Sequence, residues 1–147
     1  MRKLLRQAFL LSFFAVGLAA SASGGTILFL GDSLTAGLGV KQEQAYPALI
    51  EEKIREKKLP FDVINAGVSG DTTAGGLARL DWVLQKRIDV LVLALGANDA
   101  ALVPFLLEGV GGHDDLNQVD HIHPTAAGHK ILAENVWRVL EPLLTKN

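Results

Sequence analysis

The sequence predicts an α/β fold built on a parallel sheet. Three apolar segments, residues 26–30, 61–65 and 88–95, each run into a polar loop that carries glycine. Segments with helical spacing of apolar residues lie between these segments and after them. Alternation of strand and helix along a chain is typical of a parallel sheet, so the three loops are expected at one edge of that sheet.

The first apolar segment runs without alternation into Gly31-Asp32-Ser33, which predicts a strand buried on both faces that ends at a loop. Ser33 would then lie outside the carboxyl end of a strand, where ligands bind in open α/β sheets. A serine in a glycine-rich turn is also common as a helix cap. This segment alone therefore leaves a nucleophile and a cap as alternatives.

A helix is expected from Tyr46, because apolar residues recur at helical spacing and Pro47 suits the first turn. The second strand, residues 61–65, follows it. Thr72 and Thr73 then cap a second helix that continues through Leu84.

Residues 88–95 form the most strand-like segment of the chain and stop at Gly96-Ala97-Asn98-Asp99. Residues 102–107 predict a further strand, although Pro104 removes one ladder donor. A last helix is expected over residues 125–140. Its predicted inner face comprises Ala127, Ile131, Leu132, Val136 and Val139.

Side chains outside these segments are given ordinary structural roles. Trp82 and Trp137 occupy positions compatible with core packing. His113 and His129 are expected to be exposed to solvent and to take no part in chemistry.

The amino terminus resembles a secretory signal. An apolar run over residues 8–20 follows three basic residues and ends at Ala20-Ser21-Ala22, which has the form of a signal-peptidase site. We expect cleavage after Ala22, a signal over residues 1–22 and one domain over residues 23–147. The alternative, an uncleaved anchor, needs about 20 apolar residues to span a bilayer.

Composition limits the classes of function. A formal net charge of -2 over 147 residues gives no electrostatic reason to bind nucleic acid. The chain has no cysteine, which excludes disulfides, a thiol nucleophile and cysteine-based zinc sites. After signal cleavage we expect a periplasmic or secreted protein without a stable membrane anchor.

The residue types that acyl transfer requires are present in the loops. The reaction needs a hydroxyl nucleophile, an imidazole that takes its proton, a carboxylate that orients the imidazole, and hydrogen-bond donors for the oxyanion. Ser33, His123 and Asp120 can fill the first three roles. The backbone N–H groups of Ser33 and Gly67 and the side-chain amide of Asn98 can supply the donors.

A metal cluster is the alternative interpretation of the last loop. Imidazole and carboxylate are ordinary zinc ligands, and Asp120, His121 and His123 lie within four residues. His113 or His129 would complete such a site. The separate Gly-Asp-Ser block favours the nucleophilic interpretation.

Four blocks together resemble those of the SGNH, or GDSL-type, hydrolases, in particular the secreted bacterial thioesterases, arylesterases and lysophospholipases. The blocks stand here as Gly31-Asp32-Ser33-Leu34, residues 65–70, residues 96–99 and residues 120–124. The resemblance implies a three-layer, flavodoxin-like fold and hydrolysis of short acyl esters, acyl-CoA or lysophospholipids through an acyl-enzyme. It implies no metal or organic cofactor.

Two features depart from that family. His121 stands where such enzymes usually have glycine. Only Ala100 and Ala101 separate the third block from residues 102–107, where relatives carry a helix and a further parallel strand, and a parallel crossover takes a dozen or more residues. We therefore expect a sheet shortened by about one strand and its helices.

The shortened sheet leaves the edge of the third strand uncovered, and such edges favour association. A homodimer through that edge is one arrangement that covers it. An inactive remnant that serves as a binding or assembly module is the alternative to an enzyme.

Overall fold

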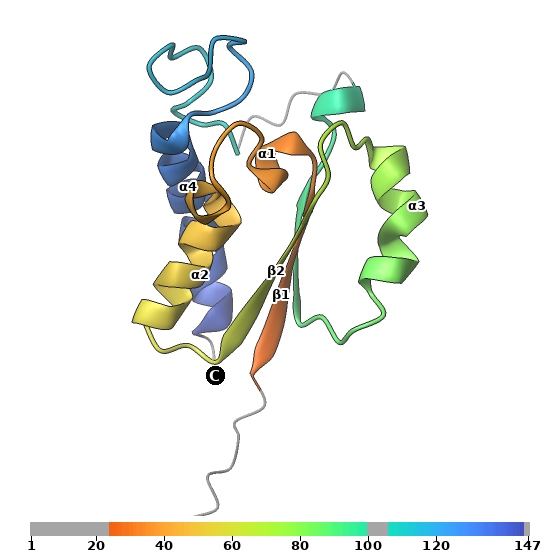
Figure 1. The fold of residues 1–147 in the computed structure, drawn as a ribbon. Coiled ribbons are helices and arrows are strands. Elements are labelled where there is room, and N and C mark those ends of the chain that lie inside the picture. Colours follow the sequence, from red (N-terminus) through yellow and green to blue (C-terminus); the bar gives the residue numbers. More distant parts are fainter. Residues whose placement is uncertain (1–23, 100–105, 146–147) are drawn as a thin grey trace, which may run out of the picture.

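A three-stranded parallel sheet forms the centre of the computed structural model, which describes residues 24–99 and 106–145 (Figure 1). The strands are β1 (Gly25–Gly31), β2 (Phe61–Gly67) and β3 (Val90–Ala94), in the order β2-β1-β3. The predicted α/β class with a parallel sheet is thus confirmed.

The register of the sheet aligns the carboxyl ends of its strands. Gly31 at the end of β1 pairs with Gly67 of β2 on one side and with Ala94 of β3 on the other. The loops that follow the three strands therefore leave from one edge, as the sequence predicts. These loops carry the first three sequence blocks.

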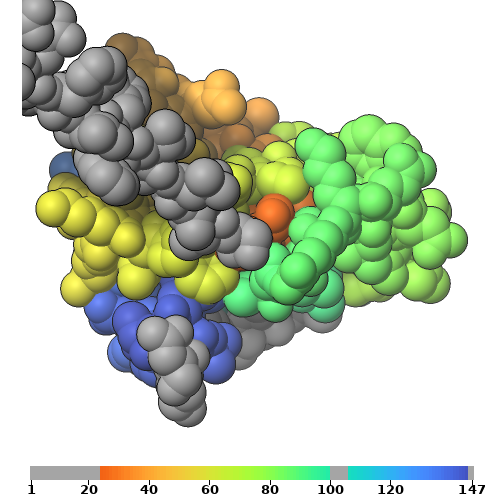
Figure 2. Space-filling view, turned by 90° about the horizontal axis from the view of Figure 1, so that it is seen from below, coloured from red at the N-terminus to blue at the C-terminus, as the bar shows by residue number. Residues whose placement is uncertain are grey.

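Helices cover both faces of the sheet. Seen from the amino ends of the strands, α2 and α4 lie on one side of β1 and α3 on the other (Figure 2). The helical elements are α1 (Ser33–Ala36), η1 (Gln42–Gln44), α2 (Tyr46–Glu56), α3 (Thr73–Val83), η2 (Ala97–Asp99) and α4 (Ala126–Leu144). No helix in the described part of the chain is long and apolar enough to cross a membrane.

The hydrophobic core lies between the sheet, α2 and α4. β1 contributes Ile27 and Phe29, which meet Ile50 of α2 and Leu132 of α4 in one buried cluster. Trp137 belongs to this cluster, as predicted. Trp82 does not, because α3 buries only Gly76 and leaves the Trp82 side chain 70% exposed. The prediction for Trp82 is wrong.

The last helix differs from its predicted form. It continues past residue 140 to Leu144 and contains Pro142, and its cap is Thr125, whose side chain accepts from the Gly128 N–H. Of its predicted inner face, Leu132 and Val136 are buried and Ile131 packs against the core, as predicted. Ala127 and Val139 are exposed, because they lie at the margins of the buried face. The buried residues of α4 include Leu132, Ala133, Val136, Trp137 and Leu140.

The predicted fourth strand lies mostly outside the described residues, which omit positions 100–105. Leu106 and Leu107 are described and belong to turns rather than to a strand. Within the described ranges, β3 is therefore an edge strand.

Candidate active site

Ser33 lies in a tight turn where β1 passes into α1. The Asp32 carboxylate caps α1 and accepts from the Leu34 N–H at 3.0 Å. Gly31 is required directly before it, because a Cβ there would collide with the Thr35 side chain. Gly37, with φ of 78°, ends α1 in the left-handed conformation that glycine adopts easily. The turn thus fixes Ser33 at the carboxyl edge of the sheet.

The three predicted catalytic side chains form one hydrogen-bonded chain. His123 Nε2 lies 2.9 Å from Ser33 Oγ, and His123 Nδ1 lies 2.7 Å from Asp120 Oδ2. The histidine reaches the serine across 90 residues of sequence. This is the geometry expected of a nucleophile, a base and an orienting carboxylate.

Asp120 is prepared to act as an anion. Its Oδ1 accepts from the backbone N–H groups of His123 and Ile122, each at 3.0 Å. These two bonds, together with the bond from the His123 ring, hold the Asp120 pKa well below its usual range. The Asp120 carboxylate is therefore charged at neutral and mildly acidic pH, where it can pair with the His123 ring.

Gln118 holds the loop that carries Asp120 and His123. Its backbone N–H donates to His123 O at 2.7 Å, and its side-chain amide donates to Pro124 O at 3.0 Å. The same amide donates to Leu38 O at 2.8 Å, just after α1. Gln118 thus joins the histidine loop to the serine turn. Sequence reasoning missed it, since a glutamine in a polar loop carries no distinctive signal.

Helix α4 reaches its position by packing on α2. Lys53 of α2 pairs with Glu134, and Lys57 pairs with Glu141, at 2.7 and 2.8 Å. Exposed pairs of this kind contribute little. The larger contribution is the shared apolar cluster, in which Ile50 and Leu132 are fully buried. Because α4 directly follows the Asp-His loop, this packing places that loop over Ser33.

His129 contradicts the prediction that it is exposed. It is fully buried between α4 and α2, and its Nδ1 accepts from the Tyr46 N–H at 3.3 Å. Its Nε2 has no hydrogen-bond partner among the described residues. Burial, with a smaller contribution from the His123 charge, lowers the His129 pKa to about 4. His113 is exposed, as predicted.

The His121 ring contacts Asp114 and not the Ser33–His123–Asp120 group, and its Nδ1 lies 3.0 Å from Asp114 Oδ1. Its φ is 56°, a left-handed conformation that costs a non-glycine residue about 1–2 kcal/mol. Glycine would adopt this backbone conformation without that cost.

One predicted oxyanion donor needs correction. The Gly67 N–H donates to Asn65 Oδ1 at 2.9 Å, so this hydrogen is already used inside its own loop. A Cβ at Gly67 would also collide with the backbone of α1, which makes this glycine a packing position. Gly70, three residues later, has φ of 80° and open space around it.

The other predicted donors remain at the edge. The Ser33 N–H is the first of α1, where backbone donors lack intrahelical acceptors. Asn98 is exposed, and its side-chain amide donates one hydrogen to Asp71 O at 2.7 Å. An amide carries two hydrogens, so the second stays available for a ligand.

Arg79 connects the loops of the site, and sequence reasoning missed it. From α3, its Nε and Nη2 reach Asp71 Oδ2 at 2.8 and 2.7 Å, and Nη2 also donates to Gly31 O at 3.2 Å. The end of β1 is thereby joined to the loop after β2. Since Asp71 O accepts from Asn98, the loop after β3 is joined as well.

The metal interpretation receives no support from the side-chain arrangement. His121 and His123 bind two separate carboxylates, those of Asp114 and Asp120. Among the described residues, no group of three or more His, Cys, Asp or Glu side chains is placed to hold a metal ion.

Residues 29–109 match the model of the GDSL-like lipase/acylhydrolase family. The chain belongs to this family. Its class is therefore that of carboxylic ester hydrolases. Esterase TesA of Pseudomonas aeruginosa is 32% identical over 187 aligned positions, which cover 86% of this chain and 93% of that protein. Thioesterase 1/protease 1/lysophospholipase L1 of Escherichia coli is 44% identical over 80 residues, 54% of this chain and 37% of that protein.

A solved structure shares the fold of this family member. The crystal structure of TesA is similar to it with a TM-score of 0.78 and 32% identity, over 82% of this chain and all of that one. The 187 aligned positions of the Pseudomonas esterase exceed the 147 residues of this chain. Part of that relative therefore has no counterpart here, as expected for a shortened sheet.

Proposed function

We propose that the chain hydrolyses small carboxylic esters and thioesters with Ser33 as nucleophile, His123 as general base and Asp120 as the orienting carboxylate. The observation that carries this proposal is the unbroken hydrogen-bonded chain from Ser33 Oγ through the imidazole to Asp120 Oδ2. Family membership gives the reaction class, and this geometry supports the role proposed for each side chain.

The first half of the reaction forms an acyl-enzyme. His123 holds its Nδ1 hydrogen toward Asp120, so Nε2 accepts the Ser33 hydroxyl proton as Oγ attacks the carbonyl carbon. The tetrahedral intermediate then collapses as the imidazolium gives the proton to the leaving alcohol or thiol. Asp120 remains ionised throughout and stabilises the imidazolium.

The second half releases the acid. Water takes the place of the leaving group, His123 removes its proton, and the hydroxide attacks the Ser33 ester. Collapse of the second intermediate returns the proton to Ser33 Oγ and frees the carboxylic acid. No step requires a group that the chain does not carry.

The oxyanion is assigned to the Ser33 N–H, the Asn98 amide and the Gly70 N–H. Gly70 takes the role first given to Gly67, since the Gly67 N–H is bound to Asn65. Donors aimed at the developing charge are worth about 10²–10³ in rate each.

The substrate class follows from the relatives. Their names include esterase, arylesterase and thioesterase/lysophospholipase, which favours acyl esters, acyl-CoA and lysophospholipids. The signal-like sequence over residues 1–22 favours action in the periplasm or outside the cell. Mass spectrometry of the exported protein tests this directly, since cleavage after Ala22 leaves Ser23 at the amino terminus.

The test of the enzyme proposal compares the parent with Ser33→Ala on a short-chain p-nitrophenyl ester. We expect a loss of about 10⁴-fold or more in kcat. Ser69→Ala is the matched control, because Ser69 is an exposed serine of a neighbouring loop with no assigned role. A fluorophosphonate should add its mass to the peptide that contains Ser33. Equal rates for the parent and Ser33→Ala would refute the assignment.

A further inference from the structure

Among residues 24–99 and 106–145, no strand pairs with the outer edge of β3, which is called the free edge below. Its strand, Val90–Ala94, is entirely apolar. β2, at the other edge, carries the exposed residues Asp62 and Asn65. Charged and polar residues protect edge strands from pairing, and β3 has none.

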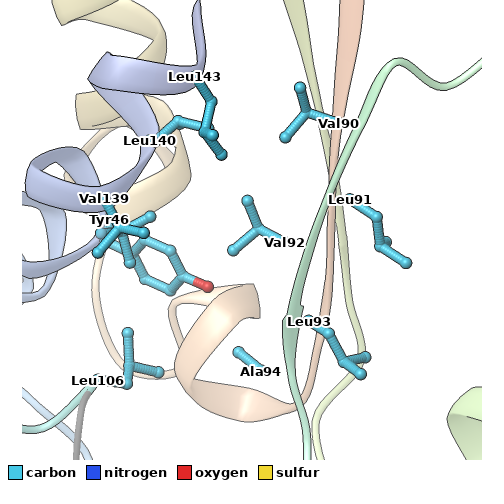
Figure 3. A pocket seen from close by; sticks show the side chains of 11 residues that line it. Tyr46, Val90, Leu91, Val92, Leu93, Ala94, Leu106, Val139, Leu140 and Leu143 are labelled. Atoms are coloured by element: carbon cyan, nitrogen blue, oxygen red, sulfur yellow. The ribbon is translucent and has the colours of Figure 1, made fainter.

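Apolar hollows flank β3 on both faces. Between β3 and α4 lies a hollow of about 200 Å³, into which Val90, Val92 and Ala94 point opposite Leu140 and Leu143 (Figure 3). Leu91 and Leu93 point to the other face, where they line a hollow of about 570 Å³ with residues of α3. Leu91 is 45% exposed and Leu93 is 63% exposed. The apolar surface at this edge therefore extends from the strand onto both faces of the sheet.

The backbone groups that face the free edge follow from the bonds at the start of β1. The Gly25 N–H donates toward β2, to Pro60 O, and the Thr26 N–H donates toward β3, to the Asp89 carboxylate. Because backbone groups alternate in direction along a strand, the N–H and C=O groups of Leu28 and Leu30 also point toward β3. In a parallel ladder their register partners, Leu91 and Leu93, turn their N–H and C=O groups away from β1.

We propose that two copies of this chain pair through β3, antiparallel about a two-fold axis at Val92, to form one six-stranded sheet. In this register Leu91 of each copy stands opposite Leu93 of the other, and both residues present free N–H and C=O groups. The two Val92 residues face each other as a non-hydrogen-bonded pair. Every edge-facing group of β3 then finds a complement.

A second copy suits this surface because the surface is self-complementary. An isologous contact places the same patch on both sides, so the apolar side chains of Leu91 and Leu93 contact the same apolar side chains of the other copy. The two-fold axis is perpendicular to the sheet, so the α3 helices of both copies lie on the same face of the six-stranded sheet.

The oligomeric state tests the proposal. The full-length chain is expressed with export, and the processed protein is measured by light scattering and sedimentation over a hundredfold range of concentration. We expect twice the monomer mass. A folded monomer at every concentration would overturn the proposal and would leave the edge to a strand from another protein. An open series of larger species would overturn it too, because a two-fold pair is closed.

Two variants identify the surface. Leu93→Pro removes an edge-facing N–H but leaves the bonds between β1 and β3, and Leu93→Lys places a charge at the contact. Both should be monomers with the circular dichroism of the parent. Trp82→Lys is the control, since Trp82 is equally exposed but lines a hollow beside β2, and it should remain a dimer. Dimers that survive both Leu93 variants would place the interface elsewhere.

Cysteine cross-linking tests the register, because the chain has no cysteine of its own. Non-hydrogen-bonded antiparallel partners lie about 4.5 Å apart between Cα atoms, within the range that a disulfide spans. Val92→Cys should oxidise to a covalent dimer. Val90→Cys should not, because two Val90 residues would lie four positions out of register, about 14 Å apart. Cross-linking at Val90 instead of Val92 would refute the proposed axis.

Discussion

Lowering the pH from 7 to 4 should destabilise the protein by a defined amount, through His129. Burial lowers the pKa of this histidine from its ordinary 6.5 to about 4. Below pH 6.5 the unfolded chain binds a proton at this position, whereas the folded chain does not until about pH 4. The stabilising contribution is therefore complete above pH 6.5 and is lost as the pH falls toward 4.

The magnitude follows from the size of the pKa change. Each unit of pKa difference is worth about 1.4 kcal/mol, so the full loss is about 3 kcal/mol, with the steepest fall between pH 6 and 4. Asp120 and Asp89 have lowered pKa values, so their contributions begin to fade only near or below the ordinary carboxyl pKa of 3.8. Burial raises the pKa of Asp32 above the ordinary 3.8, so protonation of this carboxyl in the folded state offsets part of the loss as the pH falls toward 4. The difference between the parent and a His129 variant therefore isolates the histidine.

Urea unfolding at pH 7, 6, 5 and 4 measures this loss, with His129→Gln as the matched variant. The glutamine oxygen can accept the Tyr46 N–H but cannot take up a proton in this range. The free energy of unfolding of the variant should change about 3 kcal/mol less than that of the parent. His113→Gln, at an exposed histidine, should follow the parent. Parallel pH profiles for the parent and His129→Gln would refute the reasoning.

Three further outcomes are expected from single substitutions. Asp120→Asn should lower kcat by about 10⁴-fold at neutral pH, because an amide cannot hold the His123 tautomer or stabilise its cation; ester hydrolysis measures this, and an unchanged rate would contradict the assigned role. Arg79→Lys should lower kcat by up to about a hundredfold with little change in KM, since a lysine cannot hold Asp71 and Gly31 O together, and an unchanged kcat would reduce Arg79 to a surface role. His121→Gly should raise the free energy of unfolding by about 1 kcal/mol, because it relieves the left-handed conformation and loses only an exposed pair; thermal melting measures this, and a lower melting temperature would contradict it.

The strands and the blocks that follow them could be predicted because their signals are local. An apolar run that stops at glycine and a polar residue indicates a buried parallel strand without knowledge of its neighbours. Ser33, Asp120 and His123 were predicted for the same reason, since each stands in a short block of distinctive composition. Ser33 lies at the common edge of the sheet, and the packing of α4 on α2 brings Asp120 and His123 to it.

The failures concern properties that depend on packing. Gly67 and Gly70 belong to the same sequence block, and the sequence does not say which of their N–H groups is free. Only the path of the loop directs the Gly67 N–H to Asn65. Trp82 has suitable helical spacing, but the helix it belongs to has little against which to bury it. His129 is different, because it stands three and four residues before Leu132 and Ala133, which is the spacing of the buried face. The polar side chain of His129 favoured an exposed position, whereas the helical spacing alone indicates a buried one.

The attachment of α4 to α2 has a consequence for the position of the base. The base and its carboxylate are located by the helix that follows them in the chain, while the nucleophile is located by the strand before it. The position of the base relative to the nucleophile is therefore set by β1, α2 and α4, and not by the length of chain between β3 and the last loop. A change of length in that stretch alters the edge of the sheet beyond β3 and leaves the elements that locate Ser33, Asp120 and His123 in place.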